Sequence, residues 1–171
     1  MGHQQIIQLQ SRWLHCLNKV DFLLLNKGLW FGKGTVLVEE ASLGEAVELD
    51  IEVVEDQEGY TISGRLLEAY SGEVSIRVAP NDVGTYTVDA RVAGVGLDGI
   101  GKLESEPNLI LLWNENQTLS VSVTLFVTGN GIGCRGFLKE ENRILTWEML
   151  ITLKQQAIKG DNVISFTRRK R

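Results

Sequence analysis

The sequence is poor in the residues that build most catalytic and metal sites. Its 171 residues include only two cysteines and two histidines. Cys16 and Cys134 lie far apart, so the sequence indicates neither a Cys-x-x-Cys metal motif nor a disulfide framework. His15 directly precedes Cys16, but adjacent residues on a helix do not face each other. No nucleophile–base set is visible, so we expect a protein that is not an enzyme, with no metal site and no specified cofactor.

The chain also lacks the features of secreted and membrane-spanning proteins. Residues 1–13 have neither the basic region, nor the long apolar run, nor the cleavage site of a signal peptide. The apolar run at residues 22–25 is too short to cross a bilayer. A net charge of −5 disfavours general nucleic-acid binding. We therefore expect a cytoplasmic protein with no nucleic-acid partner and no membrane insertion.

Charges of each sign gather in different parts of the chain. Acidic residues concentrate between positions 39 and 58, where Glu48, Asp50 and Glu52 alternate with apolar residues. This alternation predicts a solvated outer face rather than an acid–base pair. Residues 168–171 (RRKR) form a basic tail, for which we expect a solvated terminus, with contact to an acidic partner as the alternative.

Residues 1–27 are predicted to form an amphipathic helix ahead of the main domain. Apolar residues recur there every three or four positions: Ile6, Leu9, Trp13, Leu17 and Val20. Gly28 is suited to end such a helix. The apolar stripe must pack on the rest of the chain or on a second copy of it, so a homodimer is one of two interpretations.

From Gly32 onward the apolar period changes to two, which is typical of half-buried strands. Within residues 46–56, Val47, Leu49 and Ile51 alternate with the acidic residues. The same alternation recurs in residues 60–66, 73–79, 85–92, 118–126 and 144–153. Turn-forming residues separate these runs at intervals of about ten. The short connections predict an antiparallel meander of about ten strands, the last at residues 162–169.

Glycines inside otherwise good strands favour a closed barrel over a sandwich. These are Gly32, Gly34, Gly64, Gly99, Gly101, Gly133 and Gly136. Interior glycines usually mark bulges or the sharp bends of a barrel, and closure removes exposed sheet edges. The predicted fold class is therefore all-β, an antiparallel up-and-down β-barrel of about ten strands over residues 28–167. A barrel of this size usually leaves a cavity.

The first strand carries a W-x-G-x-G step within residues 29–36 (LWFGKGTV). Together with the helical opener and the meander that follows, it resembles the calycin superfamily of lipocalins, fatty-acid-binding proteins and nitrobindin-like barrels. The matching positions are Trp30, Gly32 and Gly34. The resemblance implies that the aromatic residue plugs one barrel end and that the glycines let the strand bend over it. The resemblance does not extend to haem binding. Nitrobindin-like barrels ligate haem iron through a histidine late in the sequence, whereas both histidines of this chain precede the barrel.

The aromatic residues of the strands either fill the core or line a pocket. The candidate ligand-lining residues are Trp30, Tyr86, Trp113, Trp147 and Phe137. Arg77 is a further candidate, because an inward-pointing arginine would pair with a ligand carboxylate. The predicted function is non-enzymatic binding of a small hydrophobic molecule in the barrel cavity.

The alternative is an interaction or structural protein with a filled barrel. Residues 109–113 (LILLW) are apolar on both faces of a strand, so their outer face needs cover. Such a protein would dimerise or dock a partner through its N-terminal helix.

Overall fold

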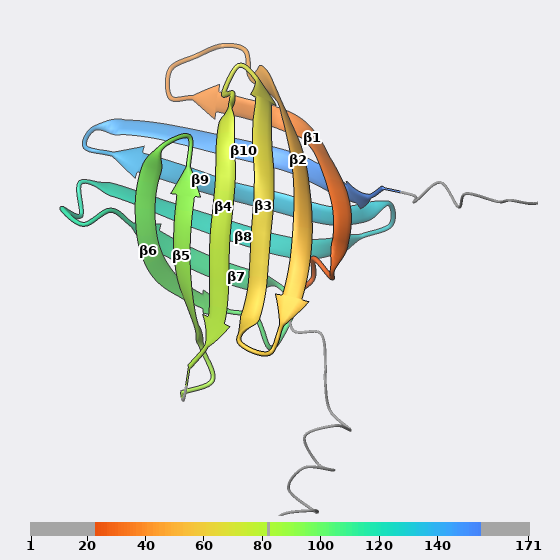
Figure 1. Ribbon diagram of the computed structural model, residues 1–171. Coiled ribbons are helices and arrows are strands. Elements are labelled where there is room, and N and C mark those ends of the chain that lie inside the picture. Colours follow the sequence, from red (N-terminus) through yellow and green to blue (C-terminus); the bar gives the residue numbers. More distant parts are fainter. Residues whose placement is uncertain (1–22, 82, 155–171) are drawn as a thin grey trace, which may run out of the picture.

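A computed structural model describes residues 23–81 and 83–154, which form one closed β-barrel (Figure 1). Its strands are β1 (Gly28–Val38), β2 (Glu45–Asp56), β3 (Gly59–Glu68), β4 (Gly72–Pro80), β5 (Tyr86–Val92), β6 (Val95–Lys102), β7 (Asn108–Trp113), β8 (Leu119–Thr128), β9 (Gly131–Glu140) and β10 (Arg143–Leu153). Each strand pairs antiparallel with its neighbours in sequence, and β10 pairs with β1 to close the sheet. The predicted ten-strand antiparallel barrel is confirmed.

Several predictions fall on other parts of the chain. Most of the expected N-terminal helix, residues 1–22, lies outside the described residues, as do the expected strand at 162–169 and the basic tail. Residues 23–27, the end of the expected helix, contain bends and no helical turn. The barrel closes at β10, so the strand predicted at 162–169 is not needed to complete it.

The up-and-down order gives the barrel two rims. One rim holds the start of β1 and the connections β2–β3, β4–β5, β6–β7 and β8–β9. We call it the plugged end, because residues 23–25 enter the barrel there. The opposite rim, the far end, consists of the connections at residues 38–45, 68–72, 92–95, 113–119 and 140–143. In Figure 1 the front strands β2–β6 run steeply across β7–β10 behind them, as the strand tilt of a closed barrel requires.

The W-x-G-x-G step explains how the seam between β1 and β10 closes. Trp30 points into the barrel near the plugged end and is 7% exposed. At Gly34 a Cβ atom would collide with the backbone of Glu148 and Met149 on β10. Glycine at this position therefore allows the first and last strands to approach closely, as expected where a sheet bends sharply.

Candidate ligand-binding interior of the barrel

The inner wall of the barrel is almost entirely hydrocarbon. Alternate residues of every strand point inward, and cross-strand pairing holds them in register, as for Val53 with Ile62 and Val78 with Val88. These inward residues form one continuous cluster. Asn108 is the only buried polar residue among the described ones.

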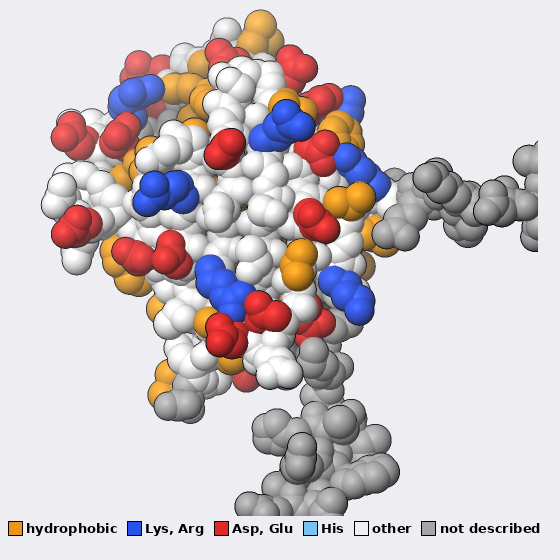
Figure 2. Space-filling view, viewed as in Figure 1, with side chains coloured by type: hydrophobic (Ala, Val, Ile, Leu, Met, Phe, Trp, Pro, Cys, Tyr) orange, Lys and Arg blue, Asp and Glu red, His pale blue; other side chains and the backbone are white. Residues whose placement is uncertain are grey.

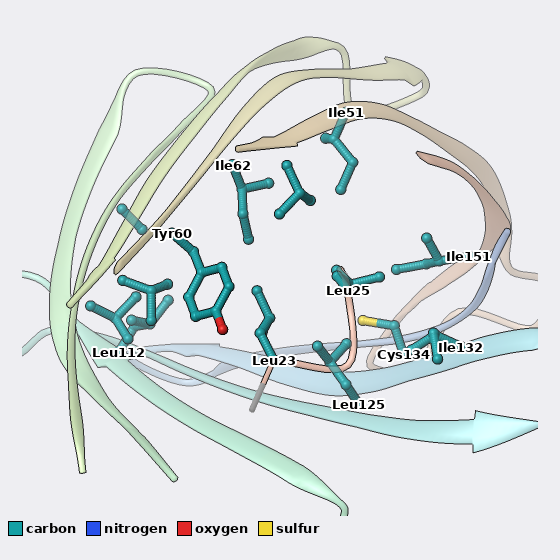
Figure 3. Packing of buried hydrophobic residues seen from close by; sticks show 14 of the residues in the cluster. Leu23, Leu25, Ile51, Tyr60, Ile62, Leu112, Leu125, Ile132, Cys134 and Ile151 are labelled. Atoms are coloured by element: carbon teal, nitrogen blue, oxygen red, sulfur yellow. The ribbon is translucent and has the colours of Figure 1, made fainter. Parts of the chain in front are cut away.

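A short segment before β1 fills the plugged end. Leu23 and Leu25 lie between the β2–β3 side of the wall and the side formed by β7–β10 (Figure 3). The backbone N–H of Leu24 donates a hydrogen bond of 2.8 Å to Oδ1 of Asn108. The Asn108 amide in turn donates to the carbonyl oxygen of Leu103 at 3.0 Å. The buried asparagine thus ties the plug to the connection between β6 and β7, where no water is needed to satisfy these groups.

The indole of Trp30 provides a second attachment for the plug. Its Nε1 donates to the carbonyl oxygen of Asn26 at 2.7 Å. The ring of Trp30 therefore fills the plugged end, which is the floor of the barrel, and its polar Nε1 atom fixes the chain segment that enters there. The aromatic plug implied by the first-strand motif is present, but Leu23 and Leu25 share its role.

Packing is tightest at the plugged end and looser toward the far end. The largest side chains with less than 2% exposure are Leu23, Leu103, Ile151, Val53, Val78 and Asn108, all near the plug. Other inward-facing side chains pack against this cluster yet remain only half-buried: Leu49, Leu66, Ile76, Ile110, Val123, Leu138, Leu145 and Trp147. They lie in the middle of their strands or nearer the far end. The apolar wall is therefore most accessible on the side away from the plug.

The predicted site residues divide between the two faces of the wall. Trp30, Tyr86 and Trp147 point inward, and the first two are buried. Trp113 and Phe137 point outward and are 37% and 44% exposed, so they do not line the interior. Because side chains alternate along a strand, a one-residue change of register moves an aromatic ring from the inside to the outside. Both faces of β7 are apolar. In such a strand the sequence contains no signal that tells which residues point inward.

Arg77 also lies on the outer face. Its guanidinium contacts Asp56 at 2.8 Å and Glu58 at 3.2 Å, and it donates to Thr61 at 2.9 Å. The hydrogen bond from Arg77 holds the pKa of the Asp56 carboxyl below its usual range. Arg77 is therefore engaged in a surface ion-pair cluster and is not placed to meet a ligand inside the barrel.

Sequence reasoning missed the plug and its anchor. Leu23 and Leu25 belong to the apolar run at residues 22–25, which the prediction included in the N-terminal helix. Asparagine is common in turns, so the sequence pattern gives no reason to expect Asn108 in the core. Only its position at the start of β7, facing inward, makes it the polar anchor of the floor.

Cys134 and Trp147 form a polar contact within the inner wall. Burial raises the pKa of the Cys134 thiol to about 11, and a hydrogen bond with the Trp147 indole lowers it in part. The neutral thiol is thus the stable form, and Cys134 packs in the wall as a small buried hydrophobic residue.

We expect Cys134 to react slowly in the folded protein. In a Cys16→Ser variant, iodoacetamide at pH 8 should modify the native protein about 100-fold more slowly than the unfolded protein, because the thiolate is the nucleophile. The raised pKa also means that the unfolded state loses this proton first, so the thiol's contribution to stability falls as the pH rises from about 9 to about 11. Mass spectrometry follows the alkylation. A native rate within threefold of the unfolded rate would contradict the burial of this thiol.

A separate shallow pocket of about 380 Å³ lies on the outside of the wall, across β3, β4 and β5. Its lining includes the outward side chains of Ser63, Glu73, Ser75 and Arg91. Charged side chains of both signs are scattered over the face of the molecule in Figure 2, which is typical of a solvated surface. The pocket does not connect the predicted aromatic residues.

These features define a class: a closed antiparallel barrel of ten strands with an apolar interior, plugged at one end. Comparison with known protein families, with curated proteins and with solved structures gives no match. In residues 23–81 and 83–154, no helix has the length and apolar character to cross a membrane. The same residues contain no group of three or more His, Cys, Asp or Glu side chains arranged to hold a metal ion.

Proposed function

We propose that this protein is a non-enzymatic binding protein that holds a small hydrophobic molecule inside the barrel, between the plug and the far end. One observation carries the proposal: inward-facing side chains away from the plug, such as Ile76, Val123 and Trp147, stay half-buried although the core is continuous. Apolar wall that is accessible to water is a favourable surface for an apolar ligand. Trp30 and Tyr86 would then support the floor of the site, and Trp147 would contact the ligand.

Two finer assignments accompany this proposal. The closed meander, the W-x-G-x-G step and the aromatic residue at the floor support kinship with the calycin barrels. A cytoplasmic location agrees with the scarcity of cysteine and the absence of disulfide spacing in the sequence. Both remain part of the proposal.

Filling the proposed site should abolish ligand binding. We expect Val123→Phe, which adds a ring from the middle of β8, to weaken binding at least tenfold, because the ring occupies the ligand's volume. Native mass spectrometry of the freshly purified protein detects retained ligand. Quenching of tryptophan fluorescence by added apolar ligands measures the affinity. Ser120→Phe on the outer face of the same strand is the matched control. Equal binding by the two variants would place the ligand elsewhere, and a ligand-free mass without any fluorescence response would refute the proposal.

A second candidate function is interaction with another protein chain, and one observation favours it. The outer face of β6 and β7 carries four exposed apolar side chains: Ile100, Leu109, Leu111 and Trp113. Ile100 and Leu111 are direct cross-strand partners, so the patch is continuous. Large apolar patches of this kind often mark association surfaces. Sedimentation separates this candidate from the first: a dimer that becomes a monomer in Leu111→Lys would support it, and a monomeric wild-type protein would exclude self-association through this face.

A further inference from the structure

We infer that the ligand is uncharged: a hydrocarbon-rich molecule with a hydroxyl, ester or similar neutral head, and not a fatty acid or other amphiphilic anion. This inference rests on the proposed function and names its ligand class. It follows from the distribution of charge on the inner wall and at the far end of the barrel.

Between the two rims, no inward position of the described strands carries a cationic side chain, and the carboxylate of Glu55, opposite Tyr60 near the plugged end, is the one inward charge. Between the rims the cationic side chains lie on the outer face of the wall, where several of them meet carboxylates. Nζ of Lys33 lies 2.8 Å from Glu48, and the guanidinium of Arg135 lies 3.0 Å from Glu148. Arg65 points outward and lies opposite Asp50 and Glu73 in the register of the neighbouring strands. Any interior site therefore offers no cation to a carboxylate.

A fatty acid that entered with its head toward the plug would bury its carboxylate against hydrocarbon. Removing an unpaired carboxylate from water is strongly unfavourable, and the acid would have to take up a proton to remain there. Asn108, the buried polar group at the floor, already binds the Leu24 N–H and the Leu103 carbonyl. The head-inward orientation is therefore disfavoured for an anion.

The opposite orientation places the head at the far end, which is acidic. The connections of that rim contain seven glutamates and one arginine: Glu39, Glu40, Glu45, Glu68, Glu115, Glu140, Glu141 and Arg143. A carboxylate there meets like charge, whereas a hydroxyl can donate a hydrogen bond to a glutamate. Both orientations thus disfavour an anion, and a neutral head fits either one.

The test compares probes that share one alkyl chain. Wild-type protein is titrated with decan-1-ol, methyl decanoate and decanoate at pH 7.5 and low salt, below the concentration at which decanoate forms micelles, with tryptophan fluorescence and calorimetry as readouts. We expect the alcohol and the ester to bind with Kd values roughly tenfold or more below that of decanoate. The difference should narrow in 0.5 M NaCl, because salt screens the exposed rim charges.

A variant of the far end tests whether its negative charge, and not the shape of the ligand's alkyl chain, disfavours decanoate. Glu140→Gln combined with Glu141→Gln should improve decanoate binding several-fold and leave decan-1-ol unchanged. Glu52→Gln combined with Asp89→Asn makes the same charge change on the outer wall and should alter neither ligand. Decanoate binding as tightly as decan-1-ol would overturn the inference while leaving the proposed function intact. Failure of all three probes to bind would instead overturn the proposed function, and the inference with it.

Discussion

Replacing Gly99 with alanine is expected to destabilise the barrel by about 3 kcal/mol, at the upper end of the usual cost of overpacking. Gly99 lies on β6, and a Cβ atom there would collide with the backbone carbonyl of Leu111 and lie 2.9 Å from the Cα of Leu112. These are backbone atoms of β7, so no side chain can rotate to make room. The two strands must separate where the sheet bends. For a domain of this size the midpoint of thermal unfolding should fall by roughly 10 °C.

Gly96 on the same strand supplies the control. No atom lies within 4 Å of a Cβ atom built there, because Gly96 points into open space. Gly96→Ala should therefore leave stability unchanged or raise it by a few tenths of a kcal/mol through lost freedom of the unfolded chain. Circular dichroism during heating and chemical denaturation measures both variants. Similar stability of the two variants would show that β6 and β7 do not approach as closely as the structure indicates.

Truncating Leu23 is expected to have a comparable effect, although the residue precedes the first strand. Its side chain is 0% exposed and lies inside the barrel with Leu25 and Tyr60 (Figure 3). Leu23→Ala would leave a cavity in the floor, and such cavities cost about 2–5 kcal/mol for a buried leucine. We expect about 3 kcal/mol, measured as a lower urea midpoint with an unchanged denaturant dependence.

Leu29→Ala provides the comparison for the plug. Leu29 is at the start of β1 but is 41% exposed, so its truncation should change stability by no more than about 0.5 kcal/mol. The contrast is informative because the two leucines are close in sequence and differ only in which side of the wall they occupy. Equal unfolding midpoints for the two variants would mean that residues 23–25 do not contribute to the core.

Much of the barrel could be predicted because alternation of apolar and polar residues is a local property. Val47, Leu49, Ile51 and Val53 point inward as their pattern indicates, and Glu52 points outward. The alternation is clear where one face is wet, since water selects polar residues there. It fails on β7, where both faces are apolar, and Trp113 was for this reason assigned to the interior although it lies outside.

The candidate site was predictable only in part for the same reason. Tyr86 could be placed inward because it lies between Thr85 and Thr87, whereas Trp30, between Leu29 and Phe31, was placed inward only by its resemblance to the first strand of the calycins. Phe137 could not, because it follows Gly136 and precedes Leu138 in a strand that contains several glycines. Arg77 is outward because its neighbours Ile76 and Val78 face the core, and its role became clear only when Asp56 and Glu58 were found beside it.

Local pattern alone thus determined that this chain forms about ten antiparallel strands, that the sheet closes, and that Glu48, Asp50 and Glu52 face outward. Tertiary structure decided which residues meet inside: Leu23 and Leu25 with the floor, Asn108 with Leu24, and Cys134 with Trp147. The physical reason is the range of the interactions. Strand alternation and turns depend on neighbours in sequence, whereas the plug and its hydrogen bonds join residues far apart in sequence that only barrel closure brings together.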